Sequence, residues 1–153
     1  SEDYMFLVDV INKSNIIDLD SKEYYIYNLN DSSMSTKYIP SLSYDMFFVN
    51  EWIFKNIINE NLDLNEGYVC CICNSYLRFV QNEVRNRNIS TWEKVEKIYK
   101  FKKEKNLEHY LNQVWYKKRK FDLKSFIGMI LFKFNLEFIY VILFKLKVKI
   151  KER

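Results

Sequence analysis

The chain has 153 residues, of which 48% are hydrophobic and 18% aromatic, so it is long and apolar enough for one domain with a core and is not a disordered tail. Its net charge of +4 hides a gradient: residues 1–68 carry −8, residues 69–116 carry +4 and residues 117–153 carry +8. The basic, apolar tail is expected to face an anionic partner, for which a lipid surface and a nucleic acid are the candidates.

The first forty residues combine helix, strand and loop signals. Glu2 and Asp3 precede a dense apolar run, which predicts a short, mostly buried helix capped by Asp3. Two short strands are predicted next, around residues 16–19 and over residues 24–29, because both segments are rich in β-formers. The loop over residues 30–36 is so rich in hydroxyl and amide groups that it should lie at a surface or in a site.

From Ser41 onward the apolar residues recur at helical spacing, which predicts a wholly helical region. Ser90 with Glu93 three residues later is a capping-box pattern and marks a helix start. The predicted helices cover about residues 43–59, a segment that starts near residue 63, and residues 90–103, 107–116 and 122–144. The most regular apolar stripe comprises Val69, Ile72, Cys73, Tyr76, Leu77, Val80 and Val84.

The last predicted helix is apolar except for Lys133, Asn135 and Glu137 near its centre. A charge at the centre of a membrane span costs about 2.5–3.5 kcal/mol, which disfavours a span even if Lys133 pairs with Glu137 at i, i+4 spacing. An apolar helix between basic flanks is instead typical of a membrane-surface anchor, and the alternative is a core helix with a solvated lysine-rich end. The flanking basic residues are Lys117, Lys118, Arg119, Lys120, Lys145, Lys147 and Lys149.

Cys70, Cys71 and Cys73 are the only cysteines, and their odd number favours a reducing cytoplasm over a disulfide framework. A zinc site would need more ligands than these and the single histidine, so no metal site is predicted. No recognised module frames the basic residues, so no nucleic-acid partner is predicted. The chain begins with Ser and shows no signal-peptide pattern, and we expect a fragment or a truncated frame, with a processed N-terminus as the alternative.

The order of these features resembles that of the bacterial family 2 glycosyltransferases that build capsule, exopolysaccharide and lipopolysaccharide glycans. A Ser-Glu-Asp helix entrance, an apolar helix, a β segment, a Tyr-x-Tyr strand at Tyr25–Tyr27 and an Asn-x-x-Ser-x-Ser/Thr loop follow one another. The resemblance is specific over Ser1–Tyr38. It is weaker over residues 41–153, where it rests on a helical, lysine-rich, apolar C-terminus.

The resemblance implies a nucleotide-diphospho-sugar-binding α/β fold, of which residues 1–40 would be the C-terminal remnant, followed by a helical region over residues 41–153. It implies an inverting displacement in which Asp3 deprotonates the acceptor hydroxyl and Glu2 shapes the acceptor site. The hydroxyl-rich loop would meet sugar or diphosphate oxygens, or would simply close the fold. The loop residues concerned are Asn30, Ser32, Ser33, Ser35 and Thr36.

The chain also departs from the family. The nucleotide-binding strands and an Asp-x-Asp motif do not precede the acidic pair, and Asp18-Leu19-Asp20 has that spelling but follows it. The isolated chain is therefore expected to hold no cofactor and to be inactive. The full-length enzyme is expected to use Mg²⁺ or Mn²⁺, a nucleotide-sugar donor and a glycan acceptor, as a peripheral protein at the cytoplasmic face of the inner membrane. The competing interpretations are a helical interaction protein without chemistry and a basic nucleic-acid binder.

Overall fold

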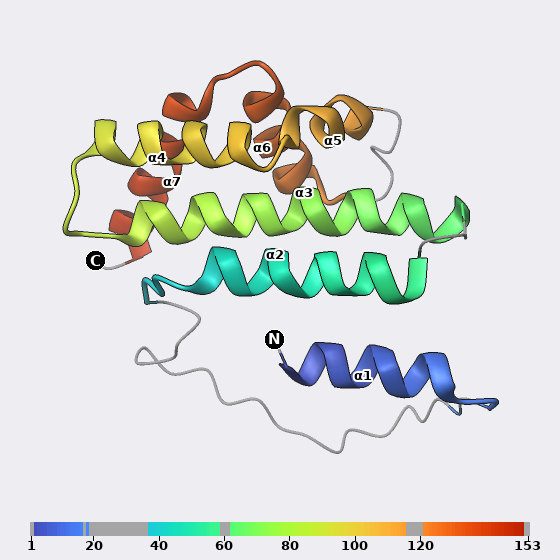
Figure 1. Cartoon of the computed structure of the whole chain (residues 1–153). Helices are drawn as coiled ribbons and strands as arrows, with labels where there is room; N and C mark the ends of the chain where they lie inside the picture. The colour runs from blue at the N-terminus through green and yellow to red at the C-terminus, as the bar shows by residue number, and fades with distance from the viewer. Residues whose placement is uncertain (1, 17, 19–36, 59–61, 116–120, 152–153) are drawn as a thin grey trace.

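The computed structural model describes residues 2–16, 18, 37–58, 62–115 and 121–151 (Figure 1). Within these residues the chain forms seven α-helices and one π-helical segment, and no strand. The elements are α1 (Glu2–Lys13), α2 (Leu42–Ile53), η1 (Phe54–Ile58), α3 (Leu62–Arg85), α4 (Thr91–Glu104), α5 (Leu107–Gln113), α6 (Leu123–Lys133) and α7 (Glu137–Lys151). The strands predicted over residues 16–19 and 24–29 lie almost entirely outside the described residues.

Helix α3 is the central element, and α2, η1, α4, α5, α6 and α7 all pack against it. Every residue of its predicted apolar stripe is buried, as the helical periodicity of the sequence predicts. Aromatic rings extend this core to the neighbouring helices: the Phe79 and Phe101 ring centroids are 4.2 Å apart, and those of Tyr76 and Phe132 are 5.1 Å apart. Residues 41–153 therefore contain a helical bundle wrapped around one long buried helix.

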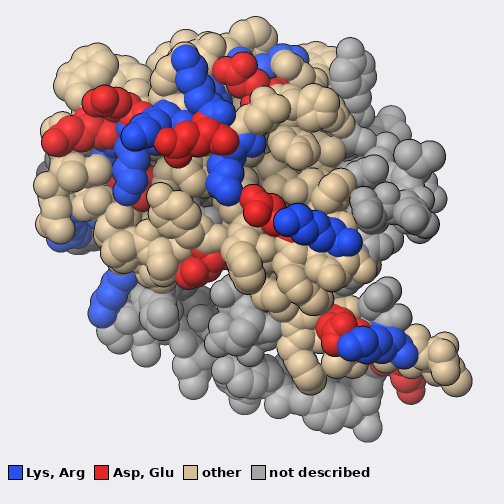
Figure 2. Space-filling model, viewed as in Figure 1, with Lys and Arg blue, Asp and Glu red and all other residues tan. Residues whose placement is uncertain are grey.

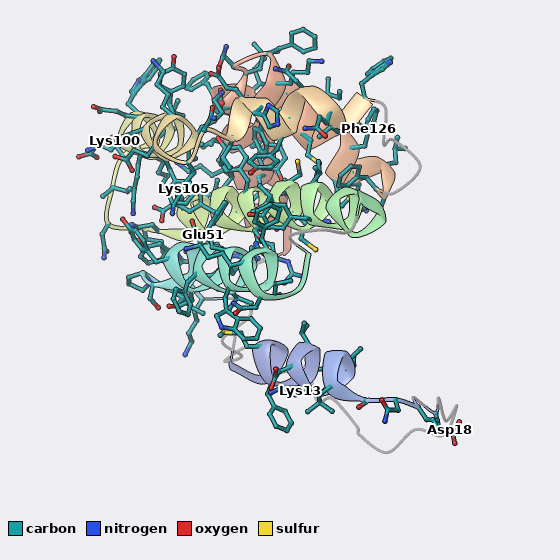
Figure 3. All side chains as sticks on the ribbon, turned by 45° about the vertical axis from the view of Figure 1, so that its right-hand side comes forward. Lys13, Asp18, Glu51, Lys100, Lys105 and Phe126 are labelled. Atoms are coloured by element: carbon teal, nitrogen blue, oxygen red, sulfur yellow. The ribbon has the colours of Figure 1, made fainter. Side chains whose placement is uncertain are left out.

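The predicted start of α4 is confirmed in atomic detail. The Glu93 backbone N–H donates to Ser90 Oγ at 3.2 Å, and the Ser90 backbone N–H donates to Glu93 Oε2 at 2.6 Å. These two bonds satisfy amides at the helix start that have no intrahelical acceptor. At the other end of α4, the Lys105 ammonium donates to Glu51 Oε1 at 3.0 Å and links α4 to α2, as Figure 3 shows.

The prediction of one continuous helix over residues 122–144 is wrong, because the chain turns between α6 and α7. Asn135 adopts a left-handed conformation with φ of 57°, which asparagine tolerates better than most residues. The Leu136 N–H donates to the Leu131 carbonyl at 2.8 Å and the Asn135 N–H to the Phe132 carbonyl at 3.2 Å. This pair of bonds is a Schellman motif, the usual way to end an α-helix, with asparagine in the place of glycine.

Gly128 allows α6 to lie close to the rest of the bundle. A Cβ atom at this position would be 2.9 Å from Tyr140 Cε2 and 3.1 Å from Leu77 Cδ1. Both distances are shorter than ordinary van der Waals contact, so a side chain here would push α6 away from α3 and α7.

Helix α1 lies at the edge of the molecule, beside α2 (Figures 1 and 3). It begins at Glu2, so Asp3 belongs to the first helical turn. The prediction that Asp3 is the capping residue before the helix is therefore wrong. The apolar side chains of α1 are also not mostly buried, contrary to the prediction: Phe6 is 71% exposed and Leu7, Val10 and Ile11 are exposed as well.

Candidate functional site

The acidic pair lies at the start of α1. The backbone of Glu2 and Asp3 forms the first turn of the helix, where amide groups without intrahelical partners create a positive potential. Such a position favours the ionised form of a carboxylate. The structure therefore places both predicted catalytic residues at a helix entrance, one turn before the exposed apolar residues of α1.

Those apolar residues form one continuous face of α1. At 100° per residue, Phe6, Val10, Leu7 and Ile11 fall within about 140° of arc, and all four are exposed. An ion pair between Lys13 and Asp9, with 2.8 Å between Nζ and Oδ2, borders this face next to Phe6. A contiguous apolar face of this kind marks a surface that contacts another protein segment or a ligand.

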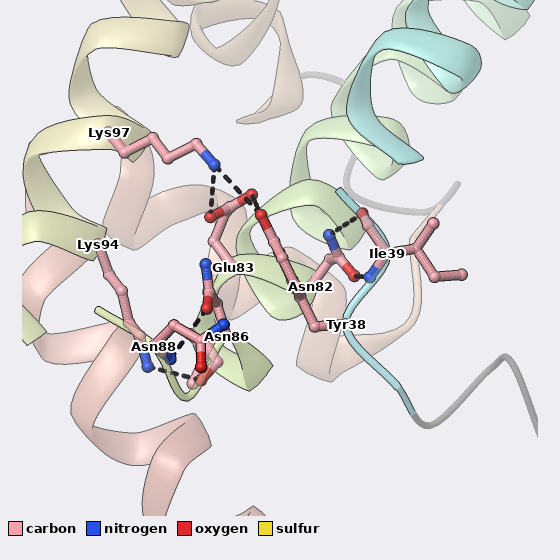
Figure 4. A network of polar contacts seen from close by, with 9 residues as sticks. Tyr38, Ile39, Asn82, Glu83, Asn86, Asn88, Lys94 and Lys97 are labelled. Carbon is pink, nitrogen blue, oxygen red and sulfur yellow. Dashed lines mark hydrogen bonds and ion pairs between the residues drawn. The ribbon is translucent and has the colours of Figure 1, made fainter. Parts of the chain in front are cut away.

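The predicted substrate-binding loop residues, Asn30, Ser32, Ser33, Ser35 and Thr36, lie outside the described residues. The chain that leaves this loop is firmly attached to α3 (Figure 4). The Asn82 side-chain amide donates to the Ile39 carbonyl at 2.9 Å, and the Ile39 N–H donates to Asn82 Oδ1 at 2.9 Å. One buried side chain thus satisfies both backbone groups of Ile39, as a partner strand would.

A charged group beside Asn82 reinforces this attachment. The Glu83 side chain is 1% exposed, and its Oε2 accepts from the Lys97 ammonium at 3.0 Å. The Tyr38 hydroxyl donates to Glu83 Oε1 at 3.4 Å. Burial lowers the pKa of Lys97, but the hydrogen bond and charge of Glu83 outweigh it, so this pKa is raised. The network joins the segment before α2 to both α3 and α4.

A second buried charge lies between α4 and the turn that separates α6 from α7. The Lys102 ammonium is fully buried and donates to the Phe132 carbonyl at 3.1 Å, to Asn135 Oδ1 at 2.6 Å and to the Glu137 carboxylate. Glu137 therefore pairs with Lys102, although its spacing from Lys133 would also have allowed an i, i+4 pair. The three acceptors match the three N–H groups of an ammonium, so the charge is fully compensated.

Both polar clusters were missed by the sequence prediction. Among the described residues, every buried side-chain nitrogen or oxygen has a hydrogen-bond partner. The charges of both clusters are paired within the fold, and each pair joins separate helices. We therefore assign a structural role to Glu83, Lys97, Lys102 and Glu137.

Charge is distributed unevenly between the helices. Figure 2 shows lysine and acidic side chains interspersed over α4, which is the pattern of a solvated face. On α7, in contrast, Lys145 and Lys147 are exposed, and Glu137 is the only acidic residue and is buried. Lys149 belongs to the same helix, whereas the other predicted membrane-surface residues, Lys117, Lys118, Arg119 and Lys120, lie outside the described residues.

The described residues contain no group of three or more His, Cys, Asp and Glu side chains that could hold a metal ion. Burial raises the pKa of the Cys73 thiol to about 12, with a smaller contribution from Cys70, so this thiol stays protonated at neutral pH. In the same part of the chain, no helix has the length and apolar character needed to cross a bilayer.

Comparison of the chain with protein-family models, with curated proteins and with solved structures gives no match.

Proposed function

We propose that the chain is the C-terminal part of an inverting glycosyltransferase of the family 2 type, which moves a sugar from a nucleotide-sugar donor to a glycan or lipid-linked acceptor. The observation that carries the proposal is the acidic pair in the first turn of α1, followed by an apolar helix face with no cover among the described residues. In this account residues 1–40 are the end of an α/β catalytic domain, and the face of α1 packs against the strands of that domain. Residues 41–153 form its helical C-terminal region.

The proposed chemistry depends on Asp3. Its carboxylate accepts the proton of the acceptor hydroxyl as that oxygen attacks the anomeric carbon, and the bond to the nucleotide diphosphate breaks on the opposite side. The helix N-terminus keeps the carboxylate ionised before the transfer, and Glu2 shapes the acceptor site. Hydroxyl and amide groups of the loop over residues 30–36 bind sugar or diphosphate oxygens.

The helical bundle supports this loop in the proposed enzyme. Because Asn82 and Glu83 fix Ile39 and Tyr38, the last residues before α2 have a defined position relative to α3. A loop attached at one end to a rigid helix is easier to hold in a productive geometry. The bundle thus acts as the platform for the loop.

In the proposed enzyme a divalent metal, Mg²⁺ or Mn²⁺, would be held by residues of the donor-binding half, and it would supply positive charge to balance the leaving diphosphate. The isolated chain, with no donor-binding half, is expected to transfer nothing. We place the full-length enzyme at the cytoplasmic face of the inner membrane, where lipid-linked acceptors are available.

The test uses the protein extended upstream to include the donor-binding half, with sugar transfer measured from labelled nucleotide sugars to lipid-linked acceptors. Asp3→Asn is expected to lower the transfer rate by about 10²–10⁴-fold, the usual contribution of a general base. Asp9→Asn is the matched control, because Asp9 lies on the same helix and pairs only with Lys13 among the described residues. An Asp3→Asn enzyme as active as the Asp9→Asn enzyme would refute the assignment.

The second candidate function is a non-catalytic helical interaction or membrane-surface protein. The observation that favours it is the exposed apolar outer side of α7, a surface that chemistry on α1 does not use. The two functions are distinguished by the coding sequence upstream of Ser1, since only the enzyme requires strands and an Asp-x-Asp motif there.

A further inference from the structure

Helix α7 has two apolar sides, although only one of them packs on the bundle. Glu137 and Val141 are buried, and Tyr140 and Phe144 are partly buried, so these residues define the inner side. The opposite side is apolar too, and each of its apolar residues is between 36% and 56% exposed. We call it the outer α7 face, and it consists of Phe138, Ile139, Ile142, Leu143 and Leu146.

An aromatic pair extends the outer α7 face to α4. The Trp92 ring stacks on the Phe138 ring with 4.9 Å between centroids and 19° between planes. Trp92 is 71% exposed, so most of the indole is left in contact with solvent. A contiguous surface of this composition is unusual for a face in water, because isolated exposed apolar residues are normal but apolar patches are not.

Lysines flank the outer α7 face on both sides. At 100° per residue, Lys145 falls on one edge of the face and Lys147 on the other edge, about 90–110° from its centre. Lys145 donates to Thr91 Oγ1 at 3.2 Å and so lies on the same edge as α4. No carboxylate opposes these lysines along α7, because Glu137 is buried against Lys102.

We propose that the outer α7 face docks on a bilayer that contains anionic phospholipids. Its aliphatic residues enter the boundary between headgroups and acyl chains, and Lys145 and Lys147 contact lipid phosphates. Trp92 lies at headgroup level, where an indole ring with one polar edge is favoured. The inner side of α7 stays on the bundle, so the helix lies along the membrane surface. This inference names the surface for the proposed membrane location and does not depend on glycosyl transfer.

The charge pattern favours a bilayer over other occupants. In a symmetric dimer the same patch meets itself, so the flanking lysines would face a second α7 whose one carboxylate, Glu137, is buried. A nucleic acid would be met by basic residues along the centre of the face, whereas Ile139, Ile142 and Leu146 lie closest to the centre here. An anionic bilayer satisfies both the apolar centre and the basic edges.

The experiment measures binding of the present chain to vesicles by flotation, with vesicles of phosphatidylethanolamine and phosphatidylglycerol and with vesicles of phosphatidylcholine alone. Leu143→Glu is expected to weaken binding to the anionic vesicles at least tenfold. The double variant Lys145→Gln/Lys147→Gln is expected to weaken it by about fivefold per lysine. Phe48→Glu is the matched control, because Phe48 is 61% exposed on α2, which does not pack against α7.

Circular dichroism of each variant shows whether the fold is kept, and Ile139→Glu serves as a second variant if Leu143→Glu fails to fold. Binding that is lost in the α7 variants, kept in the control and weak on phosphatidylcholine supports the proposal. Binding that is equal in Leu143→Glu and Phe48→Glu overturns it. The proposal is also overturned if the chain does not bind vesicles but forms a concentration-dependent dimer or binds a DNA duplex, and if Leu143→Glu abolishes that dimer or that binding. Since no sugar transfer is measured, this result and the test of Asp3 can fail separately.

Discussion

Lys102 and Glu137 form an ion pair inside the bundle, and the pair joins α4 to the first residue of α7. The same ammonium binds Asn135, the left-handed residue that ends the α6 segment. A single buried lysine thus compensates the charge at the start of α7 and holds the turn between the last two helices.

Replacement of Lys102 by Met is expected to destabilise the bundle by about 3–5 kcal/mol, because Glu137 would be left buried without its partner. The measurement is urea unfolding followed by circular dichroism. The double variant Lys102→Met/Glu137→Leu removes both charges and should recover much of this loss. An unchanged unfolding midpoint in Lys102→Met would contradict the buried pair.

Asn82→Ala is expected to lower the free energy of unfolding by about 1–3 kcal/mol, since the N–H and carbonyl of Ile39 would lose their partner. Hydrogen exchange of the Ile39 amide should become markedly faster in this variant. Asn112→Ala is the control, because Asn112 is exposed on α5. Unchanged exchange at Ile39 would mean that Asn82 does not hold this segment.

Ser90→Ala is expected to cost about 1 kcal/mol of stability, because Ser90 caps α4 through the Glu93 amide. Ser41→Ala provides a matched control: Ser41 occupies the same position before α2 but its side chain makes no capping bond. Thermal unfolding of the two variants should therefore differ. Equal melting temperatures would show that the capping box of α4 does not contribute.

Two exposed carboxylates make the stability of the fold sensitive to acid. Hydrogen bonds from Ser90 lower the pKa of Glu93, and hydrogen bonds from Ser125 lower the pKa of Asp122. Because the folded-state pKa is lowered, the stabilisation is fully present above the ordinary carboxyl pKa and is lost as pH falls through the lowered value. As the pH is lowered through this acidic window, the melting temperature should decrease. The decrease should be less steep for the double variant Glu93→Gln/Asp122→Asn. Parallel pH profiles for the two proteins would contradict this prediction.

The sequence predicted most of the helical bundle, because periodicity and capping depend on neighbouring residues. The stripe through Tyr76 and Val80 and the Ser90 box are of this kind, and the structure confirms both. The break at Asn135 was missed because Phe134 and Leu136 on either side of it continue the apolar run of the predicted helix. Its one local signal is an asparagine that can take the place of a terminal glycine.

The buried charges were missed for a different reason. Lys102 lies in a lysine-rich stretch that is typical of a solvated helix surface. Its spacing of four residues from the buried Ile98 was the available signal, since it puts both on the same helix face. Its partners Asn135 and Glu137 are more than thirty residues away along the chain, so only the tertiary fold brings the three together.

The glycosyltransferase account is tested most directly by the coding sequence immediately upstream of the codon for Ser1. The account predicts a reading frame that continues into alternating strands and helices with an Asp-x-Asp motif, which would make Asp3 the general base of a complete enzyme. A stop codon followed by a genuine start, with no such frame, would contradict it and would leave a helical protein without this chemistry.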